Sequence, residues 1–336
     1  MNNILYIGQY TPGTTSRMRA EALEKFALHT TVIDVHVPFY QTSRIWRSFG
    51  FRFKHGPLVA NTQKYILDHL SEQQFDLVWV DKGILLGPAV LQKLQEQADK
   101  VVHYTPDAAF YQNQSQLFNQ SLPLYTAAIT TKSFELVEYY KFLSPDNVIL
   151  TTQGYDPAVH RPYHTFEEKT REVVFVGLYE PARATVIQSL IQAGIHVSLV
   201  GYGWKTFFQK NFKCKELEYL GDKIAGEAYG HLLSSAYFGM GLLSKRFPEK
   251  HTTRTFEIPA CGTLLLTEKN LETLSFYSAE EVAFYTDVQD LIQQIIYLKT
   301  HKDELKKRTE RGHEKVKEAG YAYTTLLKAV LDKLGV

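Results

Sequence analysis

The feature that most constrains the fold of this chain is an alternation of short apolar runs with longer amphipathic stretches. Apolar, β-branched runs typical of buried strands recur along the first 152 residues, at 3–8, 31–37, 75–81, 100–106, 127–131 and 147–152. Stretches whose apolar residues have helical spacing, such as 16–29 and 88–98, lie between them. This alternation is typical of α/β proteins, in which helices cover a parallel sheet.

The alternation stops at residues 153–172, which contain a glycine, two prolines and clustered charges, and then starts again. Further strand-like runs follow at 173–177, 196–201, 217–221 and 237–243, and the charged stretch 302–334 is predicted to be helical. The pattern therefore predicts an α/β fold with two doubly wound units joined by one connection. Because ligands bind at the carboxyl ends of parallel strands, we expect a site in the cleft between two facing units.

Composition excludes several classes of protein. The 336 residues carry 37 Lys and Arg against 36 Asp and Glu, so the basic excess of a nucleic-acid binder is missing. The two cysteines, Cys214 and Cys261, are too few for a disulfide framework and favour a reducing, cytoplasmic location. The first residues lack the pattern of a secretory signal, and no apolar run reaches the ~18 residues of a membrane span.

The first strand is followed by a glycine-containing turn. Gly8 and Gly13 have the spacing of a P-loop, but Thr14 stands where the phosphate-binding lysine belongs. A dinucleotide fingerprint is absent too, which argues against a nicotinamide dehydrogenase. A glycine-containing turn before a helix can still face an anion or a sugar, so we take Gly8, Gly13 and Arg17 as candidate binding residues. The alternative is an ordinary turn between a strand and a helix.

Two segments of the second half are candidates for binding a nucleotide. Gly177 ends a strand and Arg183 begins the next helix, where a guanidinium and helix N–H groups can converge on a phosphate. Trp204, in "GYGWKTFF", is a candidate for stacking on a base. The alternatives are a solvated arginine and a tryptophan buried in the core.

The segment "LLSKRFPEKHTTRTFEIPACG" at 242–262 concentrates charged residues after an apolar strand. Arg254 and Glu257 are three residues apart and so share one helical face, in a short helix that Pro259 bends and Gly262 ends. Lys245, Glu249 and His251 precede them. A solvated loop explains each charge singly but does not explain their concentration.

This segment resembles the donor-binding motif of GT-B glycosyltransferases of the group 1 type, in which Glu-x7-Glu precedes Ala-Cys-Gly. The stretch "RTFEIPACG" is most similar to the CgeB-like family, and "YTPDAAF", "QGYDPAVHRPY", "FVGLYEPAR" and "VGYGW" agree with it. The resemblance covers roughly residues 100–330. It implies an N-terminal acceptor-side domain at 1–160, a C-terminal donor domain at 161–320, and a last helix at 321–336 that packs back on the N-terminal domain.

The resemblance also implies roles for individual residues. Glu257 would accept hydrogen bonds from the ribose, Glu249 would contact the transferred sugar, and Arg183 would bind the diphosphate. The arginine that often follows the strand glycine is replaced by Leu178, and Lys245 or Arg254 would compensate. The donor-binding set is therefore Gly177, Arg183, Trp204, Lys245, Arg254 and Glu257, and the catalytic candidates are Glu249, His251 and Asp107. The acceptor-side set is Gly8, Gly13, Arg17 and Asp107.

The expected chemistry needs neither a metal nor a cofactor beyond the nucleotide-sugar donor. No Asp-x-Asp motif follows a strand, so fixed cations and helix N-termini would stabilise the leaving diphosphate. A retaining transfer, in which a diphosphate oxygen takes the acceptor proton, is the expected outcome. In an inverting enzyme, Asp107 or His103 would be the base, although each can equally be a structural residue.

Residues 39–55 interleave Arg44, Arg47, Arg52 and Lys54 with aromatic residues, and no acid intervenes. The combination fits contact with an anionic membrane surface or a lipid-linked acceptor; the alternative is a loop that packs its aromatic rings inward. The expected partners are a nucleotide-sugar and a glycan, lipid-linked or protein acceptor, at the inner face of the membrane or free in the cytoplasm. Other functions that fit the sequence are a nucleotide-sugar epimerase and a non-catalytic carbohydrate-binding or assembly protein.

Overall fold

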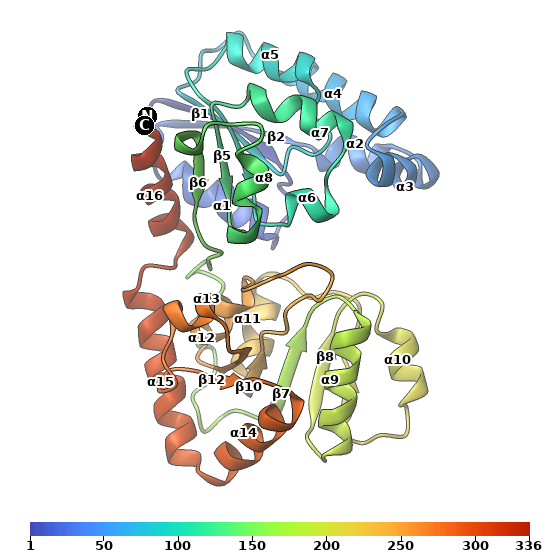
Figure 1. Cartoon of the computed structure of the whole chain (residues 1–336), viewed down its shortest axis with the longest axis vertical. Helices are drawn as coiled ribbons and strands as arrows, with labels where there is room; N and C mark the ends of the chain where they lie inside the picture. The colour runs from blue at the N-terminus through green and yellow to red at the C-terminus, as the bar shows by residue number, and fades with distance from the viewer. The chain divides into compact units, whose positions relative to one another are not determined.

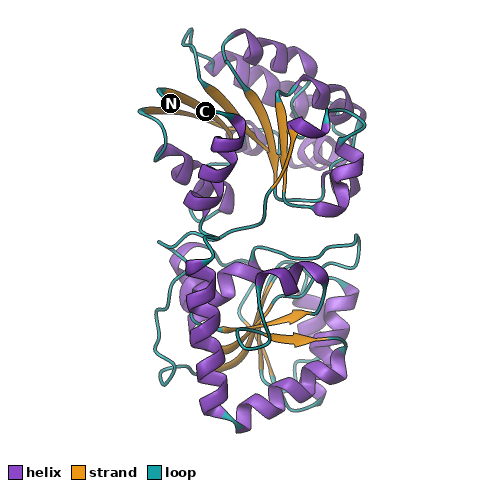
Figure 2. Ribbon diagram, turned by 60° about the vertical axis from the view of Figure 1, so that its left-hand side comes forward, coloured by secondary structure: helices purple, strands orange, loops and turns teal.

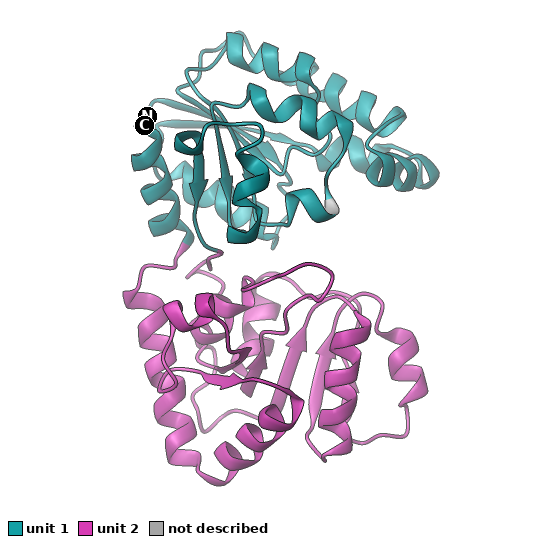
Figure 3. Ribbon diagram, viewed as in Figure 1, with its two compact units in different colours: residues 1–152, 323–336 teal, residues 153–322 magenta. Residues whose placement is uncertain are grey.

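A computed structural model describes residues 1–336, with the exception of the side chain of Gln112. The chain forms two compact units (Figure 3), which are residues 1–152 with 323–336 (unit 1) and residues 153–322 (unit 2). Each contains a sheet of six strands with helices on both faces (Figure 2), as the alternation of strand and helix patterns predicts. Among the described residues, no helix has the length and apolar character that crossing a membrane requires.

Unit 1 is built on a parallel sheet with the order β2-β1-β3-β4-β5-β6 (Figure 1). Its strands are β1 (Asn3–Gly8), β2 (His29–Asp34), β3 (Leu77–Asp81), β4 (Val101–Thr105), β5 (Ala127–Thr130) and β6 (Val148–Leu150). Its helices are α1 (Thr15–Glu24), α2 (His36–Gln41), α3 (Arg44–Phe53), α4 (Pro57–His69), α5 (Pro88–Glu96), α6 (Ala109–Gln112), α7 (Gln116–Ser121), α8 (Leu136–Tyr139) and α16 (Tyr323–Leu334), with short 3-10 turns at Leu122–Leu124, Ser133–Glu135 and Pro145–Asn147.

Unit 2 has a second parallel sheet, with the order β12-β11-β10-β7-β8-β9. Its strands are β7 (Arg171–Val176), β8 (Val197–Val200), β9 (Leu217–Tyr219), β10 (Ala236–Met240), β11 (Leu264–Glu268) and β12 (Ala283–Tyr285). Its helices are α9 (Pro181–Gln192), α10 (Lys205–Lys210), α11 (Gly226–Ser234), α12 (Arg254–Ala260), α13 (Leu271–Phe276), α14 (Val288–Thr300) and α15 (Lys302–Glu318).

The structure differs from the sequence prediction in three segments. The strand expected to reach residue 37 ends at Asp34, because α2 begins at His36. Residues 39–55, considered above as a loop, lie largely in α2 and α3. The stretch 302–334, expected as one helix, is divided into α15 and α16, and between them Gly320 adopts a left-handed φ of +75° that ends α15.

A buried ion pair joins the elements of unit 1. Arg19 of α1 has no exposed surface, and its Nε and Nη2 donate to Asp81 Oδ2 at 2.9 and 2.8 Å. The Tyr6 hydroxyl of β1 donates to the same oxygen at 2.8 Å. The rings of Tyr104 and Tyr323 lie 4.8 and 5.8 Å from the guanidinium carbon, so α16, which packs beside α1, takes part in covering the charge. The pair therefore connects β1, α1, β3, β4 and α16.

Removing one partner of this pair should destabilise the protein strongly. In Arg19→Met, the Asp81 carboxylate would stay buried without its cation, and we expect a loss of about 3–5 kcal/mol. Arg17→Met is the matched control, because Arg17 lies on the same helix in a partly exposed pair with Glu21, and its loss should change the stability far less. Thermal unfolding of the full chain measures both; equal changes in the two variants would contradict the importance of the buried pair.

Candidate functional site

The first group of candidate residues lies at the carboxyl ends of β7 and β10, which are neighbours in the sheet of unit 2. The chain passes from β7 to β8 on one side and places β10 on the other, so the strand order reverses at this point. Open α/β sheets bind ligands at such a reversal. Three segments meet here: the loop after β7, the loop after β10, and α12.

The loop after β7 leads into α9 and holds Arg183 in a buried position. Arg183 is 6% exposed, and its Nη1 donates to the Leu178 carbonyl at 3.1 Å. The same Nη1 lies 3.1 Å from Glu180 Oε1, and Nη2 lies 3.9 Å from Glu249 Oε2. The Leu178 side chain is exposed, and its backbone carbonyl is the part that contacts Arg183. This position is the one at which the family often has an arginine.

The loop after β10 is tied to the loop after β7 through carboxylates. Glu180 Oε2 accepts from the Ser244 hydroxyl at 3.0 Å and from the Lys245 backbone N–H at 3.3 Å. Glu249 Oε2 accepts from the Ser244 N–H at 2.7 Å. The Lys245 ammonium forms an ion pair with Glu268 and is largely exposed. Glu249 thus holds the turn of its own loop as well as facing Arg183.

Two arginines in this group, the buried Arg183 and the partly exposed Arg254, have unused buried donors. Arg254 begins α12, and the Nε atoms of Arg183 and Arg254 are both buried without a hydrogen-bond partner among the described residues. Burial lowers the pKa of the Arg183 guanidinium, and the positive charge of Arg254 lowers it further. Two neighbouring cations with free N–H groups are unfavourable alone, and an anion between them would satisfy both. The arrangement is a candidate anion site.

Glu257 lies on the same helix as Arg254 and is buried. Its Oε2 accepts from the Tyr229 hydroxyl at 2.7 Å, and its Oε1 lies 3.7 Å from His160 Nε2. The ring of His160 packs edge-on against Tyr229. His160 belongs to the segment 153–172 that the sequence suggested as a connection, whereas the structure packs this residue into unit 2. Sequence spacing gave no signal for either Tyr229 or His160.

Trp204 and His251 do not have the roles predicted for them. Trp204 has no exposed surface, and its Nε1 donates to the Gly177 carbonyl at 2.8 Å, so a base cannot stack on it. His251 is 4% exposed; its Nδ1 bonds Glu272 Oε2 at 2.7 Å, and its Nε2 accepts from the Gln153 N–H at 3.4 Å. Both ring nitrogens are therefore engaged inside unit 2. Gly177 is used as a backbone acceptor for Trp204.

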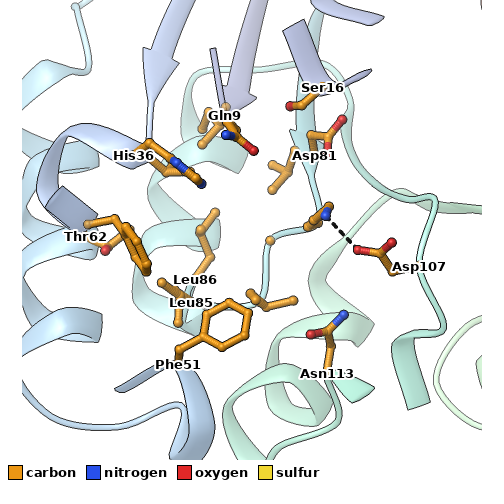
Figure 4. Close-up of a pocket in the computed structure, with 17 residues that line it drawn as sticks. Gln9, Ser16, His36, Phe51, Thr62, Asp81, Leu85, Leu86, Asp107 and Asn113 are labelled. Atoms are coloured by element: carbon orange, nitrogen blue, oxygen red, sulfur yellow. Dashed lines mark ion pairs between the residues drawn. The ribbon is translucent and has the colours of Figure 1, made fainter. Parts of the chain in front are cut away.

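Unit 1 contains a cavity of about 290 Å³ at the carboxyl ends of β1, β3 and β4 (Figure 4). The order of strands in this sheet reverses between β1 and β3, so the cavity occupies the corresponding position for ligand binding. Figure 4 shows His36 and Phe51 directed into it, with Leu85 and Leu86 between them and Asp107 farther across. Most of its wall is apolar.

Polar groups line one part of this cavity. Lys82 Nζ and Asp107 Oδ2 form an ion pair at 2.6 Å, drawn as the dashed line in Figure 4. Lys82 has a left-handed φ of +69°, a strained conformation that often marks functional turns. Burial opposes the ionisation of Asp107, but Lys82, together with Lys132 and Arg19, outweighs it and lowers the pKa of this carboxyl. The predicted acceptor-side residue Asp107 therefore lies in the cavity as an ionised partner of Lys82.

The other acceptor-side candidates are not among the described residues that line this cavity. Gly8 ends β1 beside Asp81, where a Cβ atom would come 2.9 Å from that side chain, so the position requires glycine. Gly13 has a left-handed φ of +77°, and Arg17 is paired with Glu21. Neither residue is among the described residues that line the cavity. His103 is fully buried, which lowers its pKa to about 3, and it cannot act as a base there. His36, Phe51 and Lys82 were not predicted, because no local motif marks them.

The anion site can be tested with inorganic pyrophosphate. We expect pyrophosphate to raise the unfolding temperature, because a ligand that binds the native state stabilises it. Arg254→Met should weaken this binding by roughly one to two orders of magnitude, since a charge-assisted hydrogen bond contributes about 1.5–3 kcal/mol. Arg311→Met, which removes an exposed arginine of α15, is the control. Equal pyrophosphate affinity in both variants would rule out the site.

The chain was compared with known proteins. Residues 182–332 match the model of the glycosyl transferase-like family. No curated protein sequence matches the chain. Among solved structures, HepE of Anabaena in complex with UDP-glucose is similar over 100% of both chains, with 13% identity and a TM-score of 0.70.

Two further structures have the same architecture. Sucrose-phosphate synthase from Thermosynechococcus elongatus matches over 99% of both chains, with 14% identity and a TM-score of 0.69. The lipopolysaccharide outer core galactosyltransferase WaaB matches over 98% of this chain and 99% of its own, with 10% identity and a TM-score of 0.58. These likenesses confirm the predicted fold, while the narrower CgeB-like assignment stays a prediction. The chain therefore has the GT-B fold, and residues 182–332 match the glycosyl transferase-like family.

Proposed function

We propose that the protein is a glycosyltransferase that moves a sugar from a nucleoside-diphosphate donor to an acceptor hydroxyl. The observation that carries this proposal is the pair Arg183 and Arg254, two cations with unused buried donors at the strand-order reversal of unit 2. A diphosphate supplies the negative charge and the acceptor oxygens that these donors lack. The match of residues 182–332 to the glycosyl transferase-like family supports the same function.

The donor would be held by residues from all three segments of the site. Arg183 and Arg254 would bind the diphosphate, and Glu249, which faces Arg183, would contact the transferred sugar. Glu257 Oε1 lies 3.7 Å from His160 Nε2 and would accept from a ribose hydroxyl, while the Tyr229 hydroxyl donates to the other oxygen. The UDP-glucose bound by HepE supports a uridine nucleotide as the donor.

The transfer would rely on fixed cations of the protein in place of a metal. Negative charge grows on the diphosphate as the bond to the sugar breaks, and preorganised donors can lower the barrier by several kcal/mol. Arg183 is already buried and oriented by Leu178 and Glu180, so little reorganisation is needed. We expect a retaining transfer, in which the acceptor hydroxyl approaches the face that the diphosphate leaves and gives its proton to a diphosphate oxygen.

The cavity of unit 1 favours transfer over the two alternative functions. An epimerase acts on its nucleotide-sugar alone, and a non-catalytic binding protein needs no second site. A separate cavity with the Lys82–Asp107 pair at its polar part suits an acceptor. We therefore place the acceptor in unit 1 and the donor in unit 2.

We also propose that α3 brings the protein to an anionic membrane surface. Ile45, Trp46, Phe49, Phe51 and Phe53 are exposed on this helix, contrary to the alternative in which its aromatic rings pack inward. Arg44, Arg47 and Arg52 accompany them, and no acidic residue occurs between Asp34 and Asp68. Exposed apolar side chains with basic neighbours are typical of helices that lie in a membrane interface. Lys54 is not part of this surface, because it is buried at the end of α3.

The two glutamates of the donor site should have separable effects. Glu257→Ala should weaken binding of UDP by roughly one to two orders of magnitude, since it removes a charged hydrogen-bond acceptor. Glu249→Ala should lower the transfer rate while UDP affinity stays near that of the parent, because this residue would face the sugar. Calorimetry with UDP, and sugar transfer from UDP-glucose to water or to an added alcohol, measure the two effects.

Tyr229→Phe is the control for Glu257→Ala, because it removes the same internal hydrogen bond and leaves the carboxylate. Its UDP affinity should stay close to that of the parent. Saturating EDTA should leave transfer unchanged, and an activity that returns only with added magnesium or manganese would refute the metal-free mechanism. Unaltered UDP affinity in folded Glu257→Ala would contradict the ribose assignment, and UDP binding without any turnover would favour a non-catalytic protein.

The membrane proposal predicts binding to vesicles that contain phosphatidylserine and not to vesicles of phosphatidylcholine alone. Replacing Arg44, Arg47 and Arg52 by serine should weaken this binding about a hundredfold, at about 1 kcal/mol for each basic residue near an anionic surface. Replacing the exposed Lys210, Lys213 and Lys215 of unit 2 removes the same charge and should have little effect. Sedimentation with vesicles measures this; a parent protein that stays in solution would disprove the contact.

A further inference from the structure

The wall of the unit 1 cavity differs in character from a site built for a sugar alone. Side chains of Ile7, Val35, Phe39, Ile84, Leu85 and Leu86 contribute most of it. Hydroxyl-rich sugars need many hydrogen-bond partners, and burying their oxygens against such a wall without partners is unfavourable. A cavity of about 290 Å³ with this lining instead gains free energy by taking hydrocarbon out of water.

The polar groups of the cavity suit an uncharged head rather than a phosphate. Lys82 Nζ is already paired with Asp107 at 2.6 Å, so a phosphate would have to compete with that carboxylate for this cation. His36 has its Nδ1 buried without a partner among the described residues, and burial lowers the pKa of its imidazole and favours the neutral ring. A neutral imidazole and an ion pair can exchange hydrogen bonds with hydroxyl groups.

Helix α3 contributes both to the cavity and to the exposed apolar surface. Phe51 of α3 lines the cavity and is itself 52% exposed, while Ile45, Trp46, Phe49 and Phe53 of the same helix are exposed as well. Apolar surface therefore continues from the outer face of α3 to the inside of the cavity. Phe51 connects the two surfaces, and the Lys54 ammonium, which lies 4.1 Å from the centroid of its ring, covers part of that ring.

We propose that the acceptor is an alcohol with a hydrocarbon chain and an uncharged polar head, and that the unit 1 cavity holds the part of the chain next to the head. This inference rests on the proposed function, because it names the acceptor class of the same enzyme. Phe51, Ile84 and Leu86 contact the chain, and His36 with the Lys82–Asp107 pair faces the hydroxyls of the head. Glycans and proteins without an apolar chain are then poor acceptors.

Alkyl β-glucosides with methyl, butyl, hexyl and octyl chains test this inference on the full chain. Below the concentrations at which they form micelles, their binding should strengthen with length, by roughly fourfold for each methylene that enters the cavity. Calorimetry measures binding directly and needs no turnover. Equal affinity for the methyl and octyl compounds, or no binding of any of them, would overturn the proposal.

Two variants locate the binding site. Ile84→Trp fills the cavity from a partly exposed position and should abolish the dependence on chain length, whereas Leu28→Trp, at an exposed residue of unit 1, should keep it. Phe51→Ala should weaken octyl glucoside several-fold and provides a second variant if Ile84→Trp does not fold. A dependence on chain length that survives in folded Ile84→Trp would place the binding on the outer face of α3 and refute the cavity assignment.

A measurement of UDP binding distinguishes a failure of this inference from a failure of the proposed function. Ile84→Trp lies in unit 1 and should bind UDP like the parent. If the parent binds octyl glucoside in the cavity but no UDP or pyrophosphate, the donor site fails while the apolar subsite stands. If it binds UDP but shows no preference for longer chains, the transferase proposal stands and the acceptor class proposed here is wrong.

Discussion

The organisation of unit 1 depends on the ion pair between Arg19 and Asp81. A guanidinium without exposed surface is stable only when its partner and the surrounding rings are fixed. Asp81 ends β3 and Arg19 lies on α1, so the pair holds that helix in one position against the sheet. Asp81 also lines the cavity, and Lys82 follows it directly. The geometry of the polar part of the cavity therefore depends on an ion pair whose arginine is fully buried.

The same topological rule produces two sites with opposite character. Both sheets reverse their strand order at one point, and both candidate sites lie at the carboxyl ends of the strands there. In unit 2 the loops place Arg183 and Arg254 together, which suits a diphosphate. In unit 1 the corresponding cavity is mostly apolar, and its one exposed cation is paired with Asp107. A donor and an acceptor with different chemistry can thus be recognised by two copies of one architecture.

The sequence predicted those parts of the structure that depend on local pattern. Strand and helix periodicity predicted the two α/β units. The resemblance of residues 242–262 to a donor-binding motif implied donor roles for Glu249, Arg254 and Glu257, and these roles stay a prediction. Burial was harder to predict, because neither Trp204 nor His251 carries a local sign that its side chain points inward. The ion pair Lys82–Asp107 joins the segments that follow β3 and β4, and no local pattern marks it. The aromatic residues of 44–53 suggested inward packing, whereas helix formation leaves them exposed.

The return of α16 to unit 1 sets an order on biosynthesis. Tyr323 supplies one of the rings that cover Arg19, yet it is synthesised only after the whole of unit 2. Unit 1 therefore waits, with α1 uncovered on one side, while residues 153–322 are synthesised. Domains generally fold in the order of their synthesis, but here the first unit to begin folding is the last to be completed. A chain truncated before residue 323 would contain all of unit 2 but an incomplete unit 1, in which Arg19 lacks one of its covering rings.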